Sequence, residues 1–301
     1  MELQRGAVLG EGFYGKVSDG TYKKDGMKRR CAIKSLKPVT PGTQVEKVLW
    51  HYAQIAYVRE ARLLRRITKR NPEHVVKLVG AYVGPDGSLD LVLDFSLLGS
   101  IESIIEKDTF HLNDAQKANL IYQAARGVAE LHAARIVHCD VAARNFLAYF
   151  TPDAMEKGIV VKVCDLGLAA KVPKGKPGHQ ITEPRSMPLF ESPPESFFRY
   201  HTFKSDSYML GALMHVVFTG TRPHTGVSMD KVQQGMLDGG LKLAVPPQVE
   251  KAGLGVLMGR CVSIGNGLKP FTAANLAACI NNRPTVKQIV QGLDKFKDTG
   301  F

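Results

Sequence analysis

The stretch that decides the fold is His138-Cys139-Asp140-Val141-Ala142-Ala143-Arg144-Asn145, and Asp165-Leu166-Gly167 follows it further along the chain. Its central carboxylate, Asp140, is suited to accept a proton. Asn145 and Asp165 carry the hard oxygen atoms that magnesium prefers. Asp140 and Asn145 are close enough in sequence for a single loop to turn both toward one cleft. A base followed by two magnesium ligands, in this order, indicates phosphoryl transfer from a nucleotide.

Three motifs precede this stretch in the order that such a reaction requires. They are a glycine turn, Gly10-Glu11-Gly12-Phe13-Tyr14-Gly15, a lysine on an apolar strand, Cys31-Ala32-Ile33-Lys34, and a glutamate on a helix, Val58-Arg59-Glu60-Ala61. By these residues the chain resembles the eukaryotic protein kinase family. The resemblance extends over nearly the whole chain through Ser192-Pro193-Pro194-Glu195, Ser205-Asp206 and Asn282-Arg283-Pro284-Thr285.

The resemblance implies an α+β fold, the bilobal protein kinase fold. We expect a small, β-rich N-lobe over residues 1–95, with the glycine turn, Lys34 and the helix of Glu60. A larger, mainly helical C-lobe is expected over residues 96–301, with the catalytic loop, the activation segment and the peptide-binding region. Residues 96–100 look like the hinge between them.

Periodicity of the apolar residues predicts the individual elements. Strands are expected around residues 6–17, 28–36, 75–83 and 89–95. Helices are expected over 45–69, 114–133, 205–219, 254–262 and 286–297. Residues 171–188 are rich in Lys, Pro and Gly and predict a mobile loop. Residues 264–281 look like an insertion whose role the sequence does not reveal.

The template of phosphoryl transfer assigns a role to each motif. Lys34 would bridge the α- and β-phosphates of ATP, and Glu60 would hold its ammonium by an ion pair. Asp140 would accept the proton of the substrate hydroxyl, while Asn145 and Asp165 would coordinate Mg²⁺. The resemblance implies a catalytic set of Asp140, Lys34, Glu60 and Arg144, and a nucleotide site of Gly10, Gly12, Gly15, Val17, Ala32, Lys34, Asp94 and Ser96.

Other matched positions are expected to be structural. Glu195 and Arg283 match a buried ion pair of the large lobe, and Asp206 matches a residue that braces the catalytic loop. His138 is interpreted as a packed histidine, because the template gives the role of base to the aspartate. Cys164 precedes the metal-binding aspartate and is interpreted as a small core thiol.

Tyrosine is the favoured phosphoacceptor within the resemblance. The segment Ala142-Ala143-Arg144 looks like the tyrosine-kinase version of the catalytic loop, because serine/threonine kinases usually place a lysine two residues after the aspartate. Pro188 resembles the proline that tyrosine kinases place under an extended peptide. The segment 59–65 is similar to cytoplasmic tyrosine kinases that carry separate SH2 domains, although no SH2-like segment is present.

Several departures from the family pattern bear on regulation and on peptide selection. Cys139 replaces the arginine that receives a phosphorylated activation loop, and a thiol cannot pair with phosphate as a guanidinium does. Leu166 replaces the usual phenylalanine, Phe190 stands where a basic residue is usual, and Glu191 replaces a tryptophan. Residues 165–195 also contain no tyrosine. We therefore expect activity that is constitutive or controlled by a regulatory domain or partner outside this chain.

Composition narrows the class of protein further. The chain has 301 residues, of which 44% are hydrophobic, so it can bury substantial cores. Its five cysteines show no paired spacing and are interpreted as reduced thiols of a cytoplasmic protein, and no transmembrane segment is expected. The formal charge of +12 comes from dispersed lysines and arginines without interleaved aromatics, so no nucleic acid is expected as partner.

Three alternative functions remain at this stage. The first is a pseudokinase scaffold, which retention of Lys34, Glu60, Asp140, Asn145 and Asp165 disfavours. The second is a serine/threonine or dual-specificity kinase, suggested by the unusual pair at 190–191. The third, a nucleic-acid-binding module, depends on charge alone. The leading prediction is an ATP- and Mg²⁺-dependent protein kinase that acts on a protein or peptide substrate.

Overall fold

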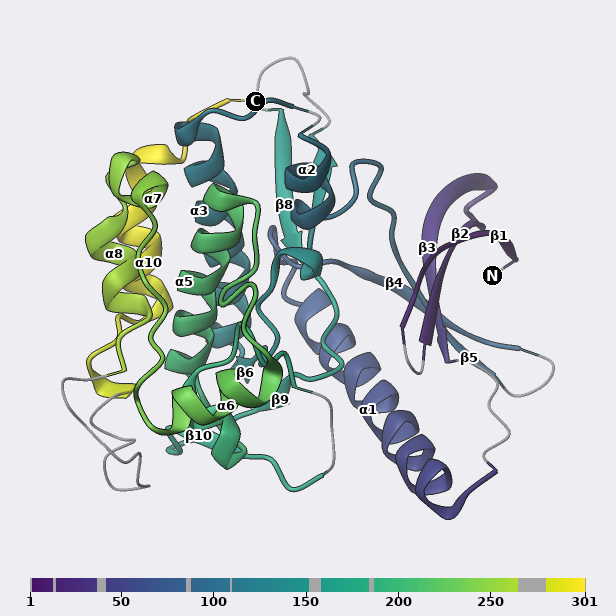
Figure 1. Ribbon diagram of the computed structural model, residues 1–301. Helices are drawn as coiled ribbons and strands as arrows, with labels where there is room; N and C mark the ends of the chain where they lie inside the picture. Colours follow the sequence, from purple (N-terminus) through teal and green to yellow (C-terminus); the bar gives the residue numbers. More distant parts are fainter. Residues whose placement is uncertain are drawn as a thin grey trace.

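The computed structural model describes residues 2–12, 15–36, 42–84, 88–108, 110–151, 158–183, 187–264 and 280–300. The N-terminal part is an antiparallel sheet with strand order β1-β2-β3-β5-β4 (Figure 1). Its strands are β1 (Leu3–Glu11), β2 (Gly15–Lys24), β3 (Met27–Leu36), β4 (Leu78–Val83) and β5 (Leu89–Asp94). The run predicted over 6–17 is therefore parts of two strands, which meet at the glycine turn.

A single long helix, α1 (Gln44–Thr68), packs beside this sheet. Thr43 and Glu46 form a capping box that satisfies backbone donors at its start. The Tyr57 hydroxyl joins the helix to the sheet, because it donates to the Lys34 carbonyl at 2.5 Å and accepts from the Leu91 amide at 3.1 Å. These two hydrogen bonds fix the position of α1 relative to β3 and β5.

The C-terminal part is mainly helical, and Figure 1 shows its helices gathered on the other side of α1 from the sheet. Its described helices are α2 (Ile101–Lys107), α3 (Asp114–Ala133), α5 (Phe203–Thr219), α6 (Met229–Leu237), α7 (Pro247–Lys251), α8 (Gly255–Cys261) and α10 (Val286–Leu293). The largest apolar core lies here and is centred on α3 and α5, which are buried around most of their circumference. It continues to the inner face of α1 through Leu64 and Ile67.

Three short strand pairs lie within the described residues of the C-terminal part. They are β6 (Ile136–Val137) with β9 (Ala170–Lys171), β7 (Phe146–Phe150) with β8 (Ile159–Val163), and β10 (Gly178–Gln180) with β11 (Tyr200–Thr202). Short 3₁₀ helices occur at η1 (Ala143–Asn145), η2 (Pro194–Phe198) and η3 (Asp294–Phe296). A β-rich region followed by a helical region confirms the α+β bilobal fold.

Most predicted helices and strands are confirmed within a few residues. The prediction of one irregular loop over 171–188 is wrong in part, because β9 and β10 lie within or beside it and pair with strands from elsewhere in the chain. Such pairing leaves no local periodicity in a two- or three-residue strand. Most of the proposed insertion at 264–281 lies outside the described residues. In the described ranges, no helix is long and apolar enough to cross a bilayer.

Candidate active site

Lys34 is held between two carboxylates. Its Nζ lies 2.8 Å from both Oε atoms of Glu60 and 2.9 Å from Oδ1 of Asp165. Glu60 reaches it from the buried face of α1, whereas Asp165 reaches it from the turn after β8. Three motifs that are far apart in the sequence therefore meet at one ammonium group.

The charges of this set are strongly coupled. Burial lowers the pKa of the Lys34 ammonium, but Asp165 and Glu60 together raise it well above its ordinary value, so the lysine is cationic. The attraction of Lys34 lowers the pKa of Asp165 to about 2. Burial raises the pKa of Glu60, with Lys34 acting against this effect. Lys34 and Asp165 are thus charged at neutral pH, as phosphate and metal binding require.

Asp140 lies in a second set of contacts on the loop of residues 138–145, which the resemblance implies is the catalytic loop. Arg144 Nη2 donates to its Oδ1 at 2.5 Å, and Asn145 Nδ2 donates to its Oδ2 at 2.8 Å. Burial raises the pKa of Asp140, and Arg144 partly opposes this shift. A raised pKa brings a carboxylate closer to the operating pH, which favours its use as a base.

Asp206 holds the turn that presents Asp140. Its buried carboxylate accepts hydrogen bonds from the backbone amides of His138 at 2.8 Å and Cys139 at 3.0 Å, and lies 2.7 Å from His132 Nε2. Cys139 adopts a left-handed backbone with a φ of 66°, which costs about 1 to 3 kcal/mol in a residue other than glycine. The hydrogen bonds from the amides of His138 and Cys139 to Asp206 offset that strain. The structural role predicted for Asp206 agrees with these contacts.

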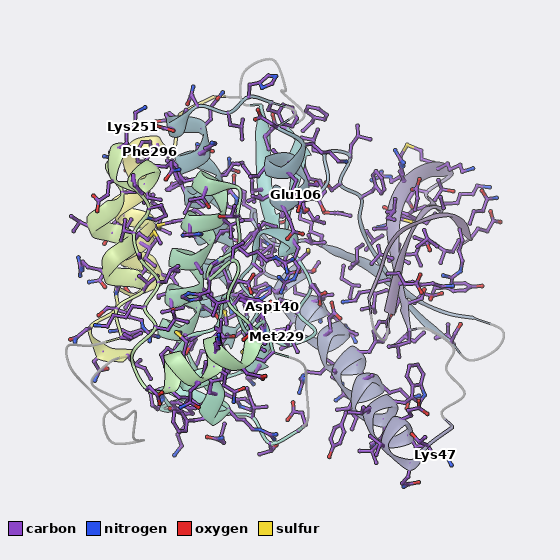
Figure 2. All side chains as sticks on the ribbon, in the orientation of Figure 1. Lys47, Glu106, Asp140, Met229, Lys251 and Phe296 are labelled. Carbon is purple, nitrogen blue, oxygen red and sulfur yellow. The ribbon has the colours of Figure 1, made fainter. Side chains whose placement is uncertain are left out.

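His138 connects the two sets. Its Nε2 lies 3.0 Å from the Cys164 carbonyl, directly before Asp165, and its Nδ1 accepts from the Asp140 amide at 3.2 Å. The ring is completely buried, which agrees with its interpretation as a packed histidine. Figure 2 shows Asp140 between the helical part and α1, whereas Lys47 lies at the outer end of α1.

The sheet presents an apolar surface beside Lys34. Val17 pairs with Lys34, and Ala32 pairs with Leu93, so these side chains share one face of the sheet. This is also the face of Leu91, which packs toward α1. An adenine ring requires such a surface, and the sequence places Val17 and Ala32 on it.

The three glycines of the hairpin differ in the space that their neighbours leave for a side chain. A Cβ atom at Gly15 would press on the Ser35 carbonyl at 3.3 Å, so packing explains this residue. A Cβ atom at Gly10 would meet nothing within 4 Å, and one at Gly12 would make only ordinary contact with the Gly15 carbonyl. The contacts of the chain therefore do not explain Gly10, and the open space suits close approach of phosphates.

Asp94 and Ser96 lie where the sheet joins the helical part. The Asp94 carboxylate is 3.3 Å from Lys162 Nζ, so it is partly committed to an ion pair. Ser96 Oγ donates to the Ala148 carbonyl at 2.6 Å and accepts from the Gly99 amide at 3.1 Å. The side chain of Ser96 thus stabilises the hinge, which leaves its backbone as the group available to a nucleotide.

The donor set fits magnesium. Both hydrogen bonds of the Asn145 side chain use its Nδ2, which leaves the amide oxygen for a cation. The side chain of Asp165 is 48% exposed, so it can contact an incoming ion. No group of three or more His, Cys, Asp and Glu residues suited to a metal occurs in the described ranges. Magnesium that is shared with substrate phosphates needs only one or two protein carboxylates.

The structure shows the contacts of two residues that depart from the family pattern, Cys139 and Glu191. Cys139 is buried in a small apolar cluster with Val137, Ala170 and Val172, and it lines a cavity of about 210 Å³ together with the activation segment (residues 165–195). Glu191 is buried with its Oε1 3.9 Å from Arg144 Nη1, and burial raises its pKa. Arg144 therefore lies between Asp140 and Glu191.

Some contacts of the site were not predicted. Arg59 of α1 forms an ion pair with Glu183 of the activation segment, and the Glu191–Arg144 contact joins the catalytic loop to the region before η2. Neither pair has a local sequence signal, because its partners are separated by long stretches of chain. The ion pair of Glu195 with Arg283, which was predicted, is present and completely buried.

Comparison with known proteins agrees with this arrangement. The sequence model described as protein tyrosine and serine/threonine kinase matches residues 3–292. The chain is 28% identical over 217 residues to tyrosine-protein kinase JAK3 of Rattus norvegicus, covering 71% of this chain and 18% of that protein. It is 27% identical over 216 residues to serine/threonine-protein kinase pakF of Dictyostelium discoideum, covering 72% of this chain and 16% of that protein.

These relatives narrow the assignment to a family but not to a phosphoacceptor. The chain spans less than a fifth of the length of either relative. One relative is named as a tyrosine kinase and the other as a serine/threonine kinase, at nearly equal identity. The family match covers almost the whole chain, and its fold agrees with the sheet and helices described above. The chain belongs to the protein tyrosine and serine/threonine kinase family.

Proposed function

We propose that this chain is a catalytically active protein kinase that transfers the γ-phosphate of ATP to protein tyrosine. The observation that carries the proposal is the convergence of Glu60 and Asp165 on Lys34, beside a catalytic loop in which Asn145 and Arg144 hold Asp140. A scaffold that has lost catalysis has no need of this complete set. The coupled geometry therefore supports an enzyme over a pseudokinase.

The reaction follows from the positions of these side chains. The substrate oxygen attacks the γ-phosphorus, the bond to the β–γ bridging oxygen breaks, and ADP leaves. Asp140 takes the proton of the hydroxyl, while Lys34 holds the remaining phosphates. Mg²⁺, held by Asn145 and Asp165, would supply neutralisation of the phosphate charge. Val17 and Ala32 would bind the adenine ring, with Gly10, Gly12 and Gly15 near the phosphates and the backbone of Asp94 and Ser96 at its edge.

We also propose a separate role for each of the two lobes. Residues 1–95 would form the nucleotide-binding lobe, and residues 96–301 the lobe that supplies the base and binds the peptide. The chain would act in the cytoplasm, which the reduced thiols predicted from sequence support. Its regulator would be a domain or partner outside this chain, which Cys139 and the absence of tyrosine from residues 165–195 support.

Tyrosine as acceptor is supported by the catalytic loop, where Ala142 stands in place of the lysine of serine/threonine kinases. Arg144, the last residue of this tyrosine-kinase-like segment, contacts Asp140 directly. The pair Phe190 and Glu191 favours the alternative, a serine/threonine or dual-specificity kinase. Glu191 is turned toward Arg144, at a position where tyrosine kinases usually carry a tryptophan.

The acceptor is tested by supplying labelled ATP, Mg²⁺ and two peptide libraries that differ only in a central Tyr or Ser. We expect label in the tyrosine library, measured as initial rates at equal peptide concentration. Preferential labelling of the serine library would overturn the tyrosine assignment and leave a serine/threonine kinase. An absence of label in both libraries and in the protein itself would favour a pseudokinase.

A further inference from the structure

An ion pair joins α1 to the activation segment, residues 165–195. Arg59 Nη1 contacts Glu183 Oε1, and the two side chains are only 26% and 19% exposed. The other oxygen of the carboxylate accepts from Thr182 Oγ1 at 3.4 Å. A charge pair in this partly desolvated position is stronger than one on an open surface.

Arg59 also contacts the beginning of the same segment. Its Nη2 donates to the Gly167 carbonyl at 3.4 Å, two residues after Asp165. Its Nε is buried and has no hydrogen-bond partner among the described residues. Glu183 is therefore the anionic group that compensates the guanidinium within the described contacts, and Arg59 ties both the start and the later part of the segment to the helix.

Because of the position of Arg59 on α1, its ion pair with Glu183 also affects the contact of Glu60 with Lys34. Arg59 directly precedes Glu60, whose carboxylate contacts Lys34 through both oxygens. Adjacent residues of a helix move together when the helix rotates or shifts. A contact that holds Arg59 against the activation segment thus also holds Glu60 at Lys34.

No phosphate is needed for this contact. A glutamate is charged at neutral pH without modification, and residues 165–195 contain no tyrosine. Cys139, at the position of the family's phosphate-binding arginine, lies in the apolar cluster with Val172. Its thiol carries no fixed positive charge with which a phosphorylated segment would pair.

We propose that Arg59 and Glu183 are positioning residues for the proposed phosphotransfer, and that their ion pair keeps Glu60 on Lys34 without phosphorylation of the activation segment. This inference rests on the proposed function, because its main consequence is a rate. In this proposal Glu183, an unmodified residue of the chain, holds α1 in place. The pair contacts neither nucleotide nor acceptor in this assignment and acts through Glu60.

The experiment measures kcat of phosphotransfer for the wild type, Glu183→Gln, Glu60→Gln and the double variant, each before and after phosphatase treatment. We expect the wild-type rate to survive the treatment. Glu183→Gln should lower kcat roughly 5- to 30-fold, as for loss of one stabilising contact in a two-state equilibrium. In the Glu60→Gln background the same substitution should cost little, because Glu183 acts through Glu60.

A control removes a more exposed Arg–Glu ion pair elsewhere in the chain. Glu73→Gln disrupts the 3.3 Å contact of Glu73 with Arg126 of α3, which involves neither Glu60 nor the activation segment. This variant should keep the wild-type kcat. A rescue variant, Arg59→Glu with Glu183→Arg, should recover part of the rate lost by either single reversal, since it restores the pair but loses the bond to Gly167.

The outcomes separate this inference from the proposed function. If the wild type is active and Glu183→Gln keeps its kcat, or if the losses of Glu183→Gln and Glu60→Gln multiply, the positioning role is overturned. If the wild type transfers no phosphate, the proposed function fails, and hydrogen exchange then tests the pair alone. Faster exchange of the α1 amides in Glu183→Gln than in Glu73→Gln would support the tie, whereas equal exchange would overturn it.

Discussion

Replacement of Asp140 by asparagine should lower the rate of phosphotransfer by about 10²- to 10⁴-fold, the range that loss of a general base typically produces. The amide has nearly the same shape as the carboxylate but cannot accept the proton of the substrate hydroxyl. Burial raises the pKa of this carboxylate, which suits it to that role. The rate is measured as initial incorporation of labelled phosphate into the preferred peptide.

Two comparisons make the Asp140 result specific. Asp238→Asn changes an exposed aspartate at the end of α6, where it only accepts from Gln234 at 2.9 Å, and should keep the wild-type rate. Asp140→Asn should retain binding of ATP, because Asp140 contacts Arg144 and Asn145 and not Lys34 in the structure. Equal labelling by Asp140→Asn and wild type would show that the label came from a contaminating kinase.

The largest effect on stability is expected at the ion pair of Glu195 with Arg283. Their side chains are 1% and 0% exposed, and Arg283 Nη1 and Nη2 contact the two carboxylate oxygens at 2.5 and 3.0 Å. Glu195→Gln leaves the guanidinium buried without its counter-charge and should lower the free energy of unfolding by about 3 to 5 kcal/mol. Denaturant titration monitored by circular dichroism measures this change.

An exposed ion pair supplies the control for Glu195. Glu102→Gln removes the contact of Glu102 with Arg222, whose side chain is 56% exposed, and should change the free energy of unfolding by less than about 1 kcal/mol. Similar effects of Glu195→Gln and Glu102→Gln would contradict the view that burial makes the former pair essential. Ser205, which also donates to Glu195 at 2.7 Å, would then be the stronger support of that region.

The sequence predicts the long elements of this fold well, for a physical reason. Helix α3 has the bounds that its apolar spacing predicts, and α1 begins at a capping box with a clear local signature. Helices of this length repeat the same signal over several turns. The strand pairs β6–β9 and β10–β11 have two or three residues each, so their formation depends on partners distant in sequence and on no pattern of their own.

The candidate site shows the same contrast. Lys34, Glu60 and Asp165 are each predicted from a motif, and the structure brings all three into contact. Ordering of motifs along the chain was sufficient for that prediction. The pair Arg59–Glu183 has no motif, because its effect depends on the distance between α1 and a segment far along the chain. The orientation of Glu191 toward Arg144 likewise depends on the tertiary fold and on no local pattern.

In the proposed mechanism Asp165 and Asn145 would hold Mg²⁺ against the phosphates of ATP beside Lys34, and titration calorimetry measures whether they do. Purified wild-type protein should bind ATP more tightly with Mg²⁺ than without it. Asp165→Asn should lose that magnesium-dependent gain while keeping its fold. An absence of ATP binding by the folded wild type, or equal affinity with and without Mg²⁺, would contradict the account.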